Sequence, residues 1–288
     1  MGLREIFDKK DFVVTTEIPP PKGVNASSSL DIAKKILGRV DGINVTDNQR
    51  GIMRMCSLAF SHLLKEIGHN PIMQVCTRDR NRLALQSDIL GAGALGIENI
   101  CVMTGYHPKL GDHPDAKPVF DLDSIQLIKV IKELETGVCM SGKRLESSVK
   151  FFVGGVANPF FEPFELELIK IKKKIDAGAE VFQTQPFFDK GSLEKFLEEV
   201  RGLNTKFLIG ISPIKSIKII NFLNEKVLTK KIPENISKRV ETAENQTEEG
   251  IRIAAEFIRE IKGMVRSIHI MPIGVESYLP YLLNEAEL

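Results

Sequence analysis

Residues 166–188 read LELIKIKKKIDAGAEVFQTQPFF, and this stretch combines the parts of one βαβ unit. Apolar residues recur at three- and four-residue spacing over Leu166–Ile175, which predicts an amphipathic helix. Gly178 follows, where a left-handed helix cap is favoured. Val181–Phe188 is then a largely apolar run, which is typical of a strand buried on both faces of a parallel sheet.

The order of helix, glycine and strand repeats along the whole chain, which indicates an α/β protein. Four further helices are expected at Leu30–Leu37, Met53–Ile67, Leu83–Leu95 and Ile125–Leu134. The strand-like runs number eight and lie at Phe12–Ile18, Gly42–Asp47, Pro71–Thr77, Asn99–Gly105, Phe151–Pro159, Val181–Phe188, Lys206–Ile214 and Ser267–Gly274. Eight such units can close into a barrel or form an open doubly wound sheet.

The segment after the first strand decides between these two architectures. Residues 17–23 read EIPPPKG, without the GxGxxG of a dinucleotide-binding turn. Consecutive prolines also remove the N–H donors that a phosphate needs at a helix start. We therefore predict a single (β/α)8 TIM barrel domain over residues 1–288, with longer loops at about 105–121 and 226–249. The second of these loops has room for a short helix.

Composition narrows the function. Hydrophobic residues make up 43% and the formal net charge is +1, so nothing in the charge favours a nucleic-acid partner. No CxxC pair or zinc-finger spacing occurs among the four cysteines. The N-terminus does not resemble a signal peptide, and no window reaches the roughly 18 apolar residues of a membrane span. We expect a cytoplasmic protein with reduced thiols.

Side chains at the C-terminal ends of barrel strands face a shared opening, which we call the mouth. The expected mouth residues are polar but include no histidine, which argues against metal-assisted hydrolysis and against a serine or cysteine triad. They are Glu17, Thr46, Asp47, Gln74, Thr77, Thr104, Gly105, Asn158, Gln183, Gln185, Ser212 and Met271. We interpret Glu17 as an acid among amides and hydroxyls, a set suited to binding a heterocycle and moving one proton.

Each of these residues also has a plain structural interpretation. Glu17 could pair with a lysine or a helix start, and Gln185 could bond loop backbone instead of a ligand ring. Asn158 follows two glycines that allow a ligand to approach, but Asn-Pro is an ordinary turn starter. The run Lys170–Lys174 is more typical of a solvated helix face than of a phosphate site, and His107 and His113 of surface loop residues.

Taken together, the motifs resemble the methylenetetrahydrofolate reductase family, from about Phe12 to Leu282. The resemblance rests on their order and spacing, because each motif is weak alone. They are TTEIPPPKG, INVTDNQRG, NICVMTG, GDHPDAKPVFDLDS, VGGVANP, and KIDAGAEVFQTQPFFD followed by IGISPIKS.

The resemblance implies a barrel that binds flavin at its mouth and reduces methylene- to methyltetrahydrofolate, a step of one-carbon metabolism that supplies methionine biosynthesis. It implies that Glu17 is the general acid and that Gln185 contacts the pterin of the folate. It places several positions near the cofactor: Thr46, Gln74, Thr104, Gly105, Phe120, Asn158 and Lys174.

Two positions depart from the family pattern. Gln74 stands where many members have histidine. Tyr106 replaces an aspartate of the TGD or RGD motif, and so faces the substrate region with a neutral phenol that cannot supply a negative charge. The activity could be retuned by this change, or supported by another group such as Asp112.

The implied cofactor is FAD, with FMN as the alternative, and the implied kinetic order is ping-pong. NADH or NADPH would reduce the flavin, or electrons would come from an iron–sulfur partner subunit, because this chain has no cluster motif of its own. A homo- or hetero-oligomer is expected.

A related flavin barrel such as proline dehydrogenase is disfavoured by the EIPPP and QTQPFF segments. The remaining alternative is a non-catalytic or retuned flavin- or folate-binding barrel subunit of a larger complex.

Overall fold

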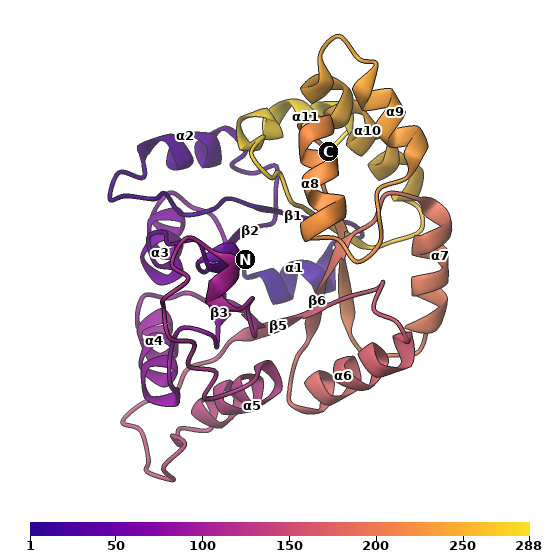
Figure 1. Cartoon of the computed structure of the whole chain (residues 1–288). Helices are drawn as coiled ribbons and strands as arrows, with labels where there is room; N and C mark the ends of the chain where they lie inside the picture. The colour runs from indigo at the N-terminus through magenta and orange to yellow at the C-terminus, as the bar shows by residue number, and fades with distance from the viewer.

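The computed structural model describes all 288 residues and contains a closed barrel of eight parallel strands (Figure 1). Each strand pairs with its neighbours in sequence order, and β8 returns to β1 through the pairs from Val13–Ser267 to Thr16–Ile270. The strands are β1 (Val13–Glu17), β2 (Gly42–Val45), β3 (Pro71–Cys76), β4 (Asn99–Met103), β5 (Phe152–Ala157), β6 (Val181–Pro186), β7 (Lys206–Ile211) and β8 (Ser267–Ile270). The predicted (β/α)8 barrel is confirmed.

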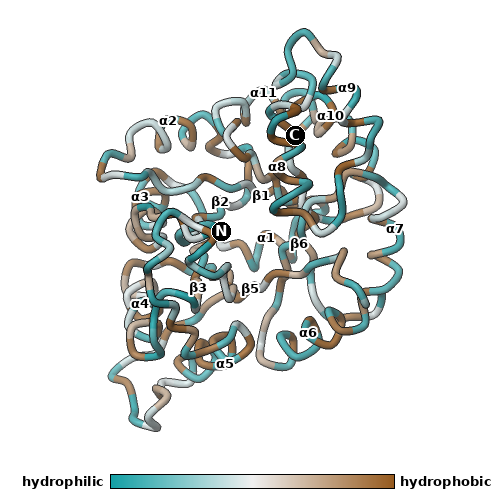
Figure 2. The backbone as a smooth tube through the Cα atoms, viewed as in Figure 1, coloured by the Kyte–Doolittle hydropathy of each residue, from teal (hydrophilic) through white to brown (hydrophobic).

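Helices surround the strands on the outside of the barrel (Figure 1). In Figure 2, hydrophobic and hydrophilic residues alternate along these helices, as expected when one face of each helix packs on the sheet. The α-helices are α1 (Leu3–Lys9), α2 (Ser27–Lys35), α3 (Ser57–Glu66), α4 (Arg82–Ala94), α5 (Ser124–Glu135), α6 (Phe164–Asp176), α7 (Lys190–Glu199), α8 (Ile217–Lys226), α9 (Glu234–Glu241), α10 (Gln246–Ile261) and α11 (Leu279–Glu285). Three short 3₁₀ turns are η1 (Gln49–Gly51), η2 (Pro108–Leu110) and η3 (Glu276–Tyr278).

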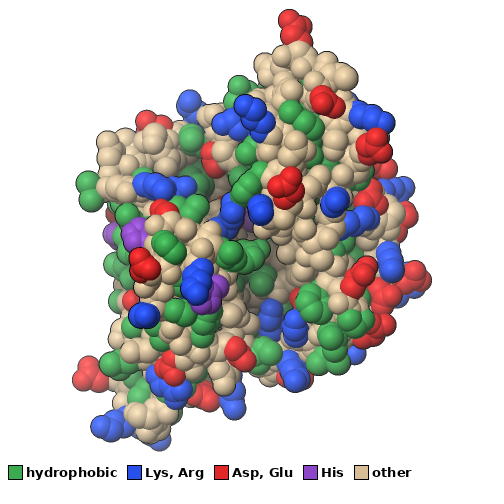
Figure 3. Space-filling view, in the orientation of Figure 1, with side chains coloured by type: hydrophobic (Ala, Val, Ile, Leu, Met, Phe, Trp, Pro, Cys, Tyr) green, Lys and Arg blue, Asp and Glu red, His purple; other side chains and the backbone are tan.

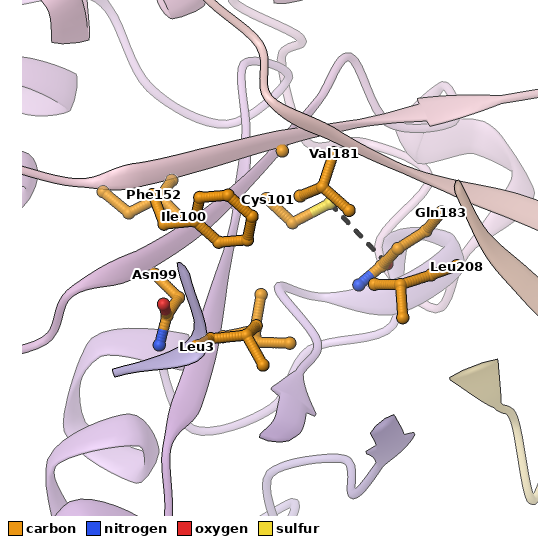
Figure 4. Close-up of a pocket in the computed structure, with 10 residues that line it drawn as sticks. Leu3, Asn99, Ile100, Cys101, Phe152, Val181, Gln183 and Leu208 are labelled. Carbon is orange, nitrogen blue, oxygen red and sulfur yellow. Dashed lines mark hydrogen bonds between the residues drawn. The ribbon is translucent and has the colours of Figure 1, made fainter. Parts of the chain in front are cut away.

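Helix α1 closes the N-terminal end of the barrel, a feature that the sequence patterns did not reveal. Leu3, Ile6 and Phe7 are buried and pack against inward-facing strand residues, including Phe152. Leu3 lies beside Phe152, Val181 and other lining residues of a small, mostly apolar cavity there (Figure 4). The helix has only seven residues, too few for a periodic pattern to stand out.

One predicted helix begins later than expected. The pattern indicated a start at Met53, but α3 begins at Ser57. The N–H of Met53 donates to Asp112 at 2.9 Å, and the N–H of Arg54 donates to the Asn48 side chain at 3.0 Å. Together with the bond from the Met55 N–H to the Pro21 carbonyl at 2.9 Å, these bonds tie the residues before α3 to neighbouring loops.

The region of residues 226–249 holds α9 and the start of α10, with Pro233 as the residue before α9. Asn224 on α8 accepts a bond from the N–H of Ile232 at 2.8 Å and fixes this segment to α8. No helix in the structure combines the length and the apolar character needed to cross a bilayer.

The α1 closure predicts a stability effect. Phe7→Ala should lower the free energy of unfolding by about 3 kcal/mol, because it removes a buried ring from the barrel end and leaves a cavity. Urea unfolding followed by circular dichroism would measure the change. Lys9→Ala, on the exposed side of the same helix, should change it by less than about 1 kcal/mol. Equal effects of the two substitutions would contradict the closure.

Candidate active site

The mouth is a hollow near the centre of the face shown in Figure 3, with lysine or arginine side chains at its rim. Parallel strands in a closed barrel all end at this face, so β1 and β6 bring Glu17 and Gln185 to the same end of the barrel. Residues of one strand alternate in direction, and Glu17 shares the inward face with Thr15, which contacts His269 inside the barrel.

Glu17 is buried, with 7% of its surface exposed, and forms no ion pair. Its Oε1 accepts a bond from Gln49 Nε2 at 3.1 Å, and its Oε2 lies 3.5 Å from Gln74 Nε2. Burial raises the pKa of Glu17 to about 7, although the bond from Gln49 opposes the rise and the negative charge of Glu276 adds to it. The lysine pairing considered from sequence is absent, and Glu17 can hold a proton near neutral pH.

Three polar side-chain atoms near the strand ends are buried without a hydrogen-bond partner. They are Thr46 Oγ1, Thr77 Oγ1 and Gln185 Oε1. Buried polar atoms in folded proteins are nearly always hydrogen-bonded. These three atoms are therefore available to bond a ligand or an ordered water at the mouth. Gln185 therefore does not bond loop backbone through its oxygen, contrary to the structural interpretation of that residue.

A polar layer lies inside the barrel, one residue step below the mouth. Asn44 and Gln183 exchange two amide bonds, at 2.6 and 2.9 Å. His269 Nδ1 lies 2.9 Å from Thr15 Oγ1, and Cys101 Sγ lies 3.6 Å from Gln183 Oε1. Burial lowers the pKa of His269 to about 3, so the ring is neutral. Sequence reasoning missed His269 and Asn44 as site residues, although both occupy inward positions of predicted strands.

Asp47, the other carboxylate expected at the mouth, is engaged in the rim. Its Oδ2 accepts the N–H of Cys76 at 2.8 Å and an ion pair from Arg80, which also bonds Asp88 at 2.9 Å. Burial raises the pKa of Asp47, and the charge of Arg80 opposes that rise. Asp47 is a structural tie between the ends of β2 and β3 rather than a free acid.

Gly105 and Tyr106 begin the loop after β4. Gly105 has φ +87°, and a Cβ there would lie 3.2 Å from Cys76 Sγ and 3.4 Å from Arg78 Cβ. Arg78, 1% exposed, donates to the Tyr106 carbonyl at 3.2 Å and to the Asn48 carbonyl at 3.1 Å. The side chain of Tyr106 is left 47% exposed, and Thr104 is exposed as well.

Farther along the same loop, Asp112 is held by other parts of the rim. It accepts from the Met53 N–H at 2.9 Å, from His113 at 2.8 Å and from Lys22 at 3.2 Å. The bonds from His113 and Met53 hold the pKa of Asp112 far below its usual value. Phe120, near the end of the loop, has φ +43° and is partly exposed.

Asn158 and Lys174 are both committed to bonds within the protein. Asn158 Oδ1 accepts the N–H of Phe160 at 3.0 Å, as in an ordinary Asn-Pro turn, and its Nδ2 donates to Thr229 Oγ1 at 3.0 Å. Lys174 lies on the buried side of α6 rather than on its solvated face, and its Nζ donates to the Val156 carbonyl at 2.7 Å. Burial lowers the pKa of Lys174. The structure has no group of three or more metal-ligating side chains arranged to hold an ion.

Comparisons with known proteins agree with this architecture. A family model described as methylenetetrahydrofolate reductase matches residues 2–287. Methylenetetrahydrofolate reductase (NADH) 1 of Arabidopsis thaliana is 32% identical over 139 residues, which cover 45% of this chain and 23% of the plant protein. The 5,10-methylenetetrahydrofolate reductase of Pectobacterium carotovorum subsp. carotovorum is 24% identical over 196 residues, 67% of this chain and 58% of that protein. The chain thus matches less than two thirds of the length of either relative.

A solved structure has the same fold over the full chain. It is an uncharacterized protein from Clostridium thermocellum that binds two copies of 5-methyl-5,6,7,8-tetrahydrofolic acid. The TM-score is 0.67 with 16% identity, and the match covers 99% of this chain and 100% of that one. At this identity the similarity shows the barrel fold alone.

The buried acid predicts a pH-dependent stability. Unfolded Glu17 loses its proton near pH 4.5 and folded Glu17 near pH 7, so the folded state holds more protons between these values and loses stability as the pH rises. Glu17→Gln has no such loss. Its unfolding free energy should therefore gain about 3 kcal/mol relative to the unsubstituted protein between pH 4 and pH 8.

Urea unfolding across that pH range would measure the difference. Glu260→Gln, which removes an exposed carboxylate on α10, serves as the control and should show a constant difference. A constant difference for Glu17→Gln as well would show that Glu17 ionises normally.

Proposed function

The chain belongs to the methylenetetrahydrofolate reductase family, and from that premise we propose that it reduces 5,10-methylenetetrahydrofolate to 5-methyltetrahydrofolate with a bound flavin. The observation that carries the proposal is Glu17, a buried acid without an ion pair whose pKa lies near 7. A group with that pKa can both hold and release a proton at neutral pH, as a general acid must.

Glu17 would act on the bridge that carries the one-carbon unit. Opening the methylene bridge to an iminium requires a proton on the departing nitrogen, and we assign that donation to Glu17. Gln49 and Gln74 bond the carboxyl oxygens and hold the group in one orientation. Neither is charged, so neither stabilises the carboxylate as a lysine or arginine would, and the acid keeps its proton until substrate takes it.

Gln185 would bind the pterin. Its Oε1 is buried and unpartnered, and the amide can accept from one ring N–H while its nitrogen donates to a ring acceptor. A site built to bond polar ring edges rejects analogues that lack them, because its own groups would then stay unsatisfied. Tyr106, exposed at the rim, is the further substrate contact that we propose.

The residues present fit a flavin at the mouth. The unpartnered Thr46 hydroxyl and the Gln74 amide offer bonds to a ring system. We assign Thr104, Gly105 and Phe120, in the loop after β4, as further contacts, and the side chains of Thr104 and Phe120 are exposed. When bound, the flavin would supply the hydride. Asn158 and Lys174 are the proposed contacts to the remainder of the cofactor, and each must exchange an internal bond to make them.

We propose FAD as the cofactor, with NADH, NADPH or an iron–sulfur partner subunit as electron donor. One opening would serve donor and folate in turn, which implies ping-pong kinetics. A retuned or non-catalytic binding subunit is the second candidate, and Tyr106 is the feature that favours it, because its neutral phenol provides no negative charge opposite a cationic intermediate.

The visible spectrum of the purified protein separates the two candidates. The reductase should show a flavin band that bleaches with NADH or NADPH, or with a chemical reductant if the donor is a partner, and recovers with methylenetetrahydrofolate. A protein that stays colourless after incubation with FAD or FMN, yet binds folate, would favour the binding subunit. Mass spectrometry of the released cofactor distinguishes FAD from FMN.

If Glu17 is the acid, its substitution should slow the folate half-reaction without slowing the reduction of the flavin by the donor. Glu17→Gln should bind flavin and accept electrons at the unsubstituted rate, while flavin reoxidation by methylenetetrahydrofolate falls at least 100-fold for lack of the acid. Stopped-flow absorbance measures each half separately. Undiminished reoxidation in this variant would remove Glu17 from the mechanism.

The neutral side chain at position 106 leads us to predict that an acidic substitution there speeds the folate half-reaction. Tyr106→Asp places a carboxylate at the mouth and should raise the rate of the folate half-reaction severalfold, because negative charge stabilises a cationic intermediate. Tyr106→Asn, which is polar but neutral, is the matched control and should not raise it. An equal rise in both variants would show that side-chain size, not charge, limits the rate.

A further inference from the structure

The turn after β2, residues 48–51, has an unusual backbone. Three of its four residues are left-handed: Asn48 has φ 44° and ψ 52°, Arg50 has φ 60° and ψ 23°, and Gly51 has φ 72°. Glycine adopts this conformation freely and asparagine tolerates it, whereas an arginine there is sterically disfavoured. A residue strained in this way persists only where its surroundings impose the conformation, and such residues cluster at ligand sites.

Bonds to two other loops fix this turn at both of its ends. At one end, the Asn48 carbonyl accepts a bond from Nη2 of the buried Arg78, in the loop after β3, at 3.1 Å. At the other end, the Gly51 carbonyl accepts the N–H of Asp112, in the loop after β4, at 3.3 Å. The two residues between these ends are therefore held in one position relative to the mouth.

These two middle residues contact different parts of the mouth. Gln49 Nε2 donates to Glu17 Oε1 at 3.1 Å, at the end of β1. The guanidinium carbon of Arg50 lies 4.5 Å from the centre of the Phe222 ring on α8. Helix α8 follows β7 and borders the mouth (Figure 1), and β1 and β8 lie between β2 and β7 in the barrel. The contact between Arg50 and α8 therefore spans the side of the mouth on which Glu17 stands.

Arg50 differs from the other arginines of this rim, because its side chain has no acceptor within the protein. The other four in the loops after β2 and β3 each donate to a carbonyl or carboxylate: Arg54 to Pro20, Arg78 to Asp79, Arg80 to Asp47 and Arg82 to Asp121. The half-buried side chain of Arg50 has the face of Phe222 as its partner and forms no hydrogen bond or ion pair. Stacking on a ring leaves the N–H groups at the edge of the guanidinium free.

We propose that Arg50 binds a carboxylate of the glutamyl tail of the folate, and thereby gives the site its preference for a substrate with an anionic tail. The inference rests on the proposed function, which supplies the folate and assigns its pterin end to Glu17 and Gln185. A planar guanidinium whose edge is free can donate two parallel bonds to one carboxylate. The turn and the Phe222 ring hold this group in place before the ligand arrives, so little freedom is lost on binding.

The position of Arg50 favours the folate tail over a cofactor phosphate. The proposed cofactor contacts Asn158 and Lys174 belong to the end of β5 and to α6, whereas Arg50 stands on the side of β2 and α8. A folate whose pterin end meets Glu17 must direct its tail outward past the rim. Arg50 is the residue after Gln49, which bonds Glu17, so it stands at the rim beside that end of the substrate.

A binding cycle tests this contact without turnover. Equilibrium dialysis against the full-length protein, with any bound flavin kept reduced, gives dissociation constants for 5-methyltetrahydrofolate and for its α,γ-diamide, in which both tail carboxylates are neutral amides. The unsubstituted protein should bind the acid about 10- to 100-fold more tightly, because the diamide forms no charge-assisted bond with Arg50. In Arg50→Asn this preference should fall to about threefold or less, with the affinity for the diamide nearly unchanged.

Matched variants separate a specific contact from general positive potential. Arg50→Asn suits the left-handed backbone, so the turn should keep its shape. Arg50→Lys keeps the charge without the planar fork and should retain only part of the preference. Lys215→Gln removes an exposed, unpaired charge from the loop after β7 and should change the preference by less than about threefold. A loss in Lys215→Gln equal to that in Arg50→Asn would overturn the proposal.

Equal binding of acid and diamide by the unsubstituted protein would also overturn the proposal, and that comparison needs no variant to fold. So would a preference that persists in Arg50→Asn. Titration of the flavin-free protein with FAD tests the phosphate alternative: a weaker affinity for FAD in Arg50→Asn, with the preference for the acid unchanged, would assign Arg50 to the cofactor.

The same measurements distinguish this proposal from the proposed function. A protein that prefers the acid through Arg50 but never reduces methylenetetrahydrofolate would retain the tail contact and refute the reductase. An active reductase that binds acid and diamide equally would retain the function and refute the tail contact. A protein that binds neither ligand would refute both.

Discussion

The hydrogen-bonded ladder between β1 and β8 closes the sheet, and the properties of the candidate site depend on this closure. An open sheet would leave the end of β1 at an edge, where water would solvate Glu17 and restore its ordinary acidity. In the closed barrel the same residue faces an interior filled by side chains, and its ionised form loses solvation. The fold thereby changes an ordinary glutamate into an acid that is protonated near neutral pH.

The barrel interior supports that environment in layers. Apolar residues and helix α1 close the N-terminal end, and a layer of neutral amides, hydroxyl, thiol and imidazole lies above them. The amides of Asn44 and Gln183 satisfy each other, so this layer carries no net charge toward Glu17. Ionisable groups are costly in such surroundings unless paired or neutral, and His269 remains neutral. At the mouth, by contrast, a buried acid has no ion-pair partner and several buried polar atoms have no hydrogen bond.

The rim depends on close backbone approaches as much as on charge. A Cβ at Gly111 would lie 1.9 Å from the Gly51 carbonyl oxygen, so the loops after β2 and β4 cross at two glycines. Arg78 binds carbonyls of both loops, and Arg80 joins Asp47 to Asp88. These contacts make one wall of the mouth from three separate loops, and they neutralise the acids within it.

The sequence by itself determined the eight strands, their parallel order, and the strand ends at which Glu17, Thr46, Gln74 and Gln185 stand, because strand burial and helix periodicity are local patterns. It could not determine which polar groups would find partners. Lys174 turned inward to a carbonyl, and Asn158 bonded a residue 71 positions away. The closing helix α1, the inner layer of His269 and Asn44, and the bonds from Gln49 and Gln74 to Glu17 were decided by the tertiary structure alone. The physical reason is that hydrogen bonding, desolvation and charge coupling act through space between segments far apart in the chain, whereas periodicity reports only which face of a segment is buried.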